Sequence, residues 1–221
     1  MAKTAIYAVL TGDLIQSTEM SPDLVGEVRR TMDDAARAVS EWREGLVVGG
    51  PEFFRGDAWQ LALGDPRMFL RVALYLRARL RAMKPQTDTR IAVGLGSAHV
   101  ERQVSLSTGA AFVRSGRKLD GMEPWRLLAA DTGDTSETMG ALDALLAVCG
   151  AVAARWKPKQ ALIASLALDP REMTQVEMGR NLGMTQQGVS DALVSSDYRV
   201  LAEAVTWVEG LDWTKRVEAA G

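Results

Sequence analysis

The sequence is poor in residues that build covalent and metal frameworks, since its 221 residues include one cysteine and one histidine. A single cysteine, Cys149, excludes an intrachain disulfide and a cysteine-based zinc site, as is typical of a protein in a reducing compartment. A single histidine, His99, excludes a histidine-rich metal site. We therefore expect a cytoplasmic protein whose stability depends on its apolar core.

Net charge is also small: 26 lysines and arginines oppose 28 acidic residues, giving a formal charge of −2. A protein that binds nucleic acid by bulk electrostatics would be basic, so the chain as a whole does not belong to that class. The N-terminal apolar run ends at Asp13, and no later run is expected to reach membrane length, so no membrane partner is predicted. Hydrophobic residues still make up 47% of the chain, enough for a core.

Hydrophobic periodicity predicts an α+β fold. Strands are expected at residues 4–10, 90–96 and 125–130, and helices at 22–42, 66–83 and 108–121. Residues 45–50 and 53–63 are expected to be extended segments around turns, the sharpest at Gly56-Asp57. The resulting order, β-α-β-β-α-β-α-β, favours a ferredoxin-like or palm-like sheet covered by helices. Strand signals stop near residue 136, so we predict an α/β domain at 1–135, a connecting helix at 136–155 and an all-α domain at 156–221.

The segment from Gln175 to Ser195 has the spacing of a helix-turn-helix. Gly179 is small where the two helices would cross, and Gly183 tolerates the positive φ that the turn needs. Thr174 and Thr185 stand where N-caps belong. The residues predicted to face inward are Met178, Leu182, Met184, Val189 and Leu193. The segment is similar to the helix-turn-helix of phage repressors and to the last region of sigma factors.

A helix-turn-helix reads the DNA major groove with the first residues of its second helix. The residues predicted to contact DNA are Thr185, Gln186, Gln187, Ser190, Asp191 and Arg180, with Lys157 and Lys159 as further phosphate contacts. A glutamine can bond adenine through two hydrogen bonds, whereas Asp191 repels phosphate unless it accepts from a cytosine amine. The region 156–221 has seven lysines and arginines against nine acids. One copy should therefore bind double-stranded DNA weakly, and a homodimer is expected; a protein-interaction adaptor is the alternative.

Two Gly-Asp pairs also stand out. Gly12-Asp13 follows the first predicted strand, and Gly56-Asp57 lies at a predicted hairpin turn. A β-α-β-β order can bring these places side by side, and two carboxylates meeting there would bind Mg²⁺ or Mn²⁺. Gly-Asp is also a common turn pair, so two structural turns are the alternative interpretation.

The segments GDLIQS, RGDAWQLAL, RIAVGLG and GAAFVRSGRKLDGM, followed by the helix-turn-helix, resemble the SatD family. The N-terminal part of that family is similar to class III nucleotidyl cyclases and related palm domains. The resemblance implies that Asp13 and Asp57 are metal-binding aspartates, with Mg²⁺ or Mn²⁺ and a nucleotide as ligands. It implies that Arg117 falls near the arginine that stabilises the transition state.

The chain departs from the cyclase pattern at two places. Val113 stands where an asparagine is expected four residues before Arg117, and Phe53 and Phe54 occupy the stretch where a base-reading lysine would precede Gly56. We therefore expect a DNA-binding transcriptional regulator whose N-terminal cyclase-like domain is a sensor or dimerisation unit. A metal-dependent nucleotidyl cyclase or nucleotidyltransferase is the alternative.

Overall fold

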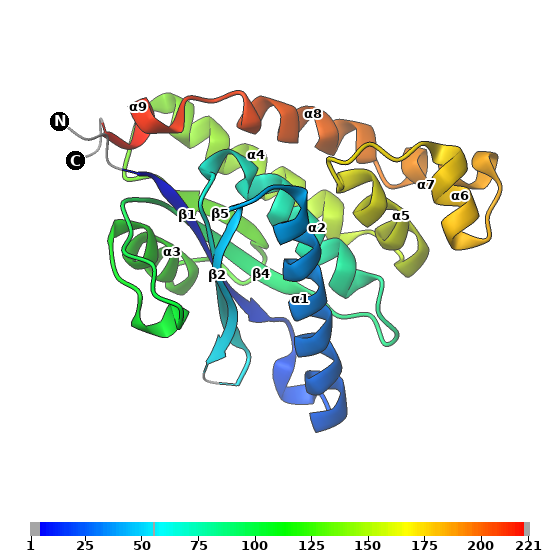
Figure 1. The fold of residues 1–221 in the computed structure, drawn as a ribbon, viewed down its shortest axis with the longest axis horizontal. Helices are drawn as coiled ribbons and strands as arrows, with labels where there is room; N and C mark the ends of the chain where they lie inside the picture. Colours follow the sequence, from blue (N-terminus) through cyan, green and yellow to red (C-terminus); the bar gives the residue numbers. More distant parts are fainter. Residues whose placement is uncertain (1–4, 55, 219–221) are drawn as a thin grey trace.

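The computed structural model describes residues 5–54 and 56–218, and it shows a mixed α+β fold around one five-stranded sheet (Figure 1). The strands are β1 (Tyr7–Leu14), β2 (Val47–Phe54), β3 (Ala58–Leu63), β4 (Thr89–Gly96) and β5 (Leu128–Asp131). They lie in the order β2-β3-β1-β4-β5. Neighbours are antiparallel except β4 and β5, which are parallel. The predicted α+β class is confirmed at this level.

Helices are present where they were predicted as far as the connecting helix, and helices alone follow it, as expected after residue 136. They are α1 (Pro22–Trp42), α2 (Phe69–Arg81), α3 (Ala110–Asp120), α4 (Glu137–Ala154), α5 (Pro158–Leu168), α6 (Gln175–Leu182), α7 (Gln186–Ser195), α8 (Tyr198–Glu209) and α9 (Trp213–Glu218). Short 3-10 turns cover Ser17–Glu19 (η1), Pro66–Met68 (η2) and Val104–Leu106 (η3). Helix α1 begins where predicted because Ser21 accepts a hydrogen bond from Leu24 N and Pro22 occupies the first turn.

The predicted end of the first strand at Leu10 is wrong. Gly12 and Asp13 lie within β1, and Gly12 pairs with Trp59 of β3 on one side and Ile91 of β4 on the other. A Cβ atom at Gly12 would lie 2.5 Å from the ring of the fully buried Trp59. The glycine is therefore needed for close packing under a tryptophan, and not for a turn.

The main core lies on the sheet face covered by α1, α2 and α4, while α3 covers the other face (Figure 1). Helices α8 and α9 return to the main core, where the Trp213 ring meets Phe69 edge to face at 5.4 Å. Leu146 and Cys149 of α4 belong to the same core. The predicted boundary at residues 136–155 therefore does not coincide with a break in the core: α4 covers the sheet near β5.

A second, smaller core joins α5, α6 and α7. Its buried members are Ile163, Met178 and Val189. Helix α5 serves both cores, since Ala161 and Ala164 face the main one. In Figure 1, α6 and α7 occupy the end of the molecule opposite α3. The α6–α7 unit thus stands at one end of the fold, attached through α5 and α8.

Buried arginines of α2 hold α4 and its junction with α5 in place. Arg77 is fully buried, forms two hydrogen bonds with Asp88 and donates to the carbonyl of Gly150 at 2.8 Å. Arg81 also pairs with Asp88 and donates to the carbonyl of Trp156 at 2.9 Å. Displacing α4 would leave a buried N–H group of Arg77 without the Gly150 carbonyl that accepts from it, which opposes movement of the helix.

One correction concerns apolar length. Helix α4 is long and apolar enough to cross a membrane by length and composition, although no run of that length was expected. A third of this 18-residue helix is buried inside the fold. The buried side of α4 contacts the main core, and its opposite side faces solvent.

Candidate nucleic-acid interface and acidic strand end

Helices α6 and α7 are joined by a short turn that two glycines make possible. Gly183 ends α6 with φ of 63°, the left-handed conformation that the sequence predicted there. A Cβ atom at Gly179 would lie 2.6 Å from the carbonyl oxygen of Met184, which accounts for a glycine where the chain passes closest. Met184 N donates to Gly179 O at 2.8 Å. The inward positions expected from sequence all join the small core.

The threonines cap both helices as predicted. Thr174 and Glu177 form a capping box, in which Thr174 Oγ1 accepts from Glu177 N and the Glu177 carboxylate accepts from Thr174 N at 2.8 Å. Hydrogen bonding from the Thr174 hydroxyl holds the pKa of Glu177 below its ordinary value. Thr185 accepts from Gly188 N at 3.1 Å. Local hydrogen bonds therefore fix where each helix begins.

The predicted DNA-contacting residues form an exposed surface with one exception. Those that are exposed are Arg180, Thr185, Gln186, Gln187 and Asp191. Ser190 is half-buried and lines a cavity between α7 and α8. Gln187 Nε2 donates to Asp191 Oδ1 at 2.7 Å. One carboxylate oxygen of Asp191 therefore has a hydrogen-bond partner within the same helix. The first turn of α7 therefore presents two amide side chains to solvent.

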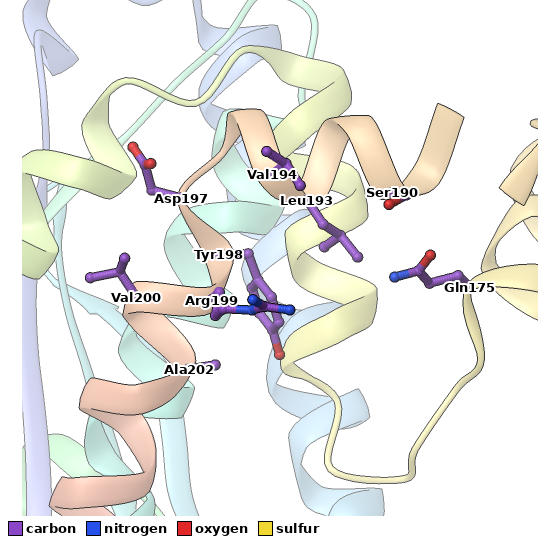
Figure 2. A pocket seen from close by; sticks show the side chains of 9 residues that line it. All are labelled: Gln175, Ser190, Leu193, Val194, Asp197, Tyr198, Arg199, Val200 and Ala202. Atoms are coloured by element: carbon purple, nitrogen blue, oxygen red, sulfur yellow. The ribbon is translucent and has the colours of Figure 1, made fainter. Parts of the chain in front are cut away.

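The cavity beside Ser190 has a volume of about 480 Å³ (Figure 2). Gln175 and Leu193 line it on the α6 and α7 side, and Tyr198, Arg199 and Val200 line it on the α8 side. Arg199 is exposed and has no ion pair among residues 5–54 and 56–218. This cation next to α7 was not singled out from the sequence, because nothing local indicates that α8 folds back beside α7.

The aspartate of the first Gly-Asp pair is bound by an arginine. Asp13 lies opposite Arg90 in the β1–β4 register, and its carboxylate accepts from Arg90 Nε at 2.9 Å and from Arg90 Nη2. These hydrogen bonds raise the pKa of Arg90. Both residues are about a quarter exposed, at 25% each. Arg90 could be found only from the strand register, which the sequence pattern does not supply.

The second aspartate lies close to the first strand. The backbone of Asp57 accepts from Leu14 N at 3.3 Å, and its side chain accepts from Ser17 Oγ at 2.6 Å. The hairpin therefore does meet the end of β1, as the topology argument expected. In this structure the Asp13 carboxylate pairs with Arg90, and one carboxylate oxygen of Asp57 accepts from Ser17. The described residues also contain no group of three potential ligands.

Arg117 lies on the solvent side of α3. Ser115 of the same helix faces the sheet and shares a hydrogen bond of 2.8 Å with Thr11. Arg117 is exposed, and two residues of an α-helix turn the chain by about 200°. Within one chain, Arg117 therefore points away from the sheet that carries Asp13 and Asp57. Val113, where an asparagine was expected, is also exposed.

No protein-family model matches the sequence, and no curated protein matches it significantly.

Proposed function

We propose that the protein is a DNA-binding transcriptional regulator in which α6 and α7 form a helix-turn-helix and α7 enters the major groove. The observation that carries the proposal is the exposed pair Gln186 and Gln187 in the first turn of a helix at the end of the molecule. Amide side chains in that position can bond adenine edges.

The composition of the α7 surface favours DNA over a protein partner. A protein-docking face presents apolar or aromatic anchors at its centre. Here the first two turns of α7 expose Thr185, Gln186, Gln187 and Asp191, while the exposed apolar residue Val194 lies at the other end of the helix. An adaptor would be expected to use Val194, and a DNA reader the glutamines.

Cations around α7 are few but available for phosphate. Arg180 and Arg199 are exposed and carry no ion pair in the described part of the chain. Lys157 precedes α5 and Lys159 lies in its first turn, and both are exposed. Each cation that meets a phosphate contributes a slope of about −0.9 to the salt dependence of binding. A single copy therefore supports modest affinity with a shallow salt dependence.

We further propose that the sheet is ferredoxin-like and cyclase-related, serving as a sensor or dimerisation unit. The order β2-β3-β1-β4 with all neighbours antiparallel supports that topology, and β5 extends it by one parallel strand. The Asp13–Arg90 pair and the outward position of Arg117 favour a non-catalytic role within one chain. Resemblance to the SatD family stays part of this proposal.

The test is selection of bound duplexes from a random DNA pool with the full chain, followed by binding measurements at several salt concentrations. Gln187→Ala should lower the preference for the selected site by about 1–3 kcal/mol while leaving non-specific binding unchanged. Gln103→Ala, an exposed glutamine before η3, is the matched control and should change neither. Absence of enriched sequences and of any duplex binding at low salt would refute the proposal.

A further inference from the structure

Helix α4 exposes a face that carries no polar side chain between its two ends. Its positions toward solvent are Glu137, Gly140, Ala141, Ala144, Val148, Ala151 and Arg155. At 100° per residue these positions fall within one stripe opposite the buried Leu142, Leu146 and Ala153. We define these exposed residues as the α4 face. Val148, at its centre, is 57% exposed.

A helix that is apolar on all sides is normally covered on all sides. Helix α4 carries no charged residue between Asp143 and Arg155, yet only a third of it is buried in one chain. Its other sides are fixed: Gly150 packs against Leu128, and its carbonyl accepts from Arg77. A partner therefore has to approach α4 where it lies in the fold.

The charges at the ends of the α4 face identify that partner as a second copy. Glu137 and Arg155 are 18 residues apart, which is five full turns of an α-helix, so they lie on the same line along the helix. When two copies of α4 pack antiparallel around a two-fold axis, each Glu137 meets the other copy's Arg155. The same register sets Ala144 against Val148 and Ala141 against Ala151. The α4 face is thus complementary to itself.

Both charged ends are available for this pairing. Glu137 is exposed and has no ion pair among the residues that the structure describes. Arg155 pairs with Asp197 at 3.2 Å, but its side chain is 70% exposed and the pair sits at the surface. Exposed pairs contribute about 0–1 kcal/mol, so Arg155 can exchange partners at little cost.

We propose that the α4 face is a homodimer interface in which two α4 helices pack antiparallel about a two-fold axis. Alanine along the centre lets helix axes approach to about 8 Å, at the close end of helix packing. One helix pair buries less than the roughly 1,600 Å² of a standard interface, so the dimer should be weak and depend on concentration. The surface can be tested without DNA, so its failure and that of the proposed function are separable.

The same axis relates two copies of α6 and α7. Two-fold symmetric DNA readers present two recognition helices to two half-sites, which raises affinity without more cations on either copy. If the proposed function holds, dimerisation through α4 therefore raises the DNA affinity that the few cations of one α6–α7 surface leave low. This consequence rests on the proposed function, whereas the interface does not.

Sedimentation velocity of the full chain over a range of concentrations gives the first measurement, with circular dichroism as the check on folding. The wild type should show a reversible monomer–dimer equilibrium, and Val148→Glu should weaken it by about a hundredfold or more, as burial of unpaired charge requires. Val113→Glu, at a position 48% exposed on α3, is the matched control and should leave it unchanged.

Charge reversal tests the antiparallel register. In an Asp197→Asn background, which removes the existing partner of Arg155, Glu137→Arg and Arg155→Glu should each weaken association by about tenfold. The double variant E137R/R155E should restore it to within about threefold. Inside one chain these residues are about 27 Å apart at 1.5 Å per residue, so restoration can arise only between chains.

Three results would overturn the proposal. The first is a monomer at every concentration, and the second is a dimer indifferent to Val148→Glu. The third is a double variant weaker than either single variant. Flotation with vesicles of mixed zwitterionic and anionic phospholipid covers the other possible occupant. Flotation of a monomeric wild type that Val148→Glu abolishes would assign the α4 face to a membrane surface.

Discussion

Glycines that the sequence singled out lie in the α6–α7 unit and near the end of β1. The two regions differ in the physical reason that each glycine is needed. Gly183 has a positive φ, and a Cβ atom at Gly179 would lie 2.6 Å from the carbonyl oxygen of Met184, five residues ahead, so both requirements are local. Gly12 is required by Trp59, which belongs to another strand. The difference shows why the turn between α6 and α7 was predicted correctly and the turn after β1 was not.

The largest expected effect is that of Gly12→Ala. A Cβ atom there would lie 2.5 Å from the Trp59 ring and 2.6 Å from the Arg90 carbonyl oxygen, both buried in the sheet. The free energy of unfolding should fall by about 3 kcal/mol, which urea denaturation measures. Gly116→Ala is the control: a Cβ atom there meets nothing within 4 Å, and it should stabilise α3 by about 0.5 kcal/mol. A harmless Gly12→Ala would contradict the close approach of Trp59 and of the Arg90 carbonyl to β1.

Gly179→Ala should have a smaller effect confined to one end of the molecule. The new methyl group would press on the Met184 carbonyl at 2.6 Å and separate α6 from α7. We expect a loss of about 2 kcal/mol, with faster hydrogen exchange in α6 and α7 and little change in the sheet. Gly26→Ala in α1, where the nearest atom is a flexible arginine terminus, should be neutral or slightly stabilising. Uniformly faster exchange throughout the chain would contradict this separation of the two regions.

Thr174→Ala should have the smallest effect of the three, about 1 kcal/mol, since it removes one helix cap. Its pH dependence sharpens the test. The folded pKa of Glu177 is lowered from 4.5, so the capping box stabilises α6 above that pH and loses its contribution as pH falls through the folded pKa. Hydrogen exchange in α6 measured between neutral and acid pH should therefore show the wild type approaching the variant. A difference that grows on acidification would reverse the sign and reject the capping interpretation.

Much of the fold was predictable because the helix starts and turns depend on interactions between residues a few positions apart. The α1 start depends on Ser21 and Pro22, and the two caps of α6 and α7 depend on threonines three residues from their partners. The hairpin at Gly56-Asp57 also came out where turn chemistry indicated, and it does approach β1. These features need no knowledge of what lies across the sheet.

The candidate site was predictable only in part. The glutamines of α7 were placed on an exposed surface by the helical period alone, and they are exposed. Three facts depended on elements distant in sequence: Arg90 occupies the Asp13 carboxylate, Arg199 lies beside α7, and Arg117 points to solvent. Each of them changes what the neighbouring residues can bind.

By itself the sequence determined the order of helices and strands as far as α4, the caps of α6 and α7, and the turn between them. All of these follow from hydrogen bonds and backbone angles within a few residues. The tertiary structure alone decided that β1 runs on through Gly12 and Asp13, that α8 and α9 return to the main core, and that α4 keeps one apolar face uncovered. These outcomes depend on strand register and on which apolar surfaces meet, and a local pattern of residues contains neither.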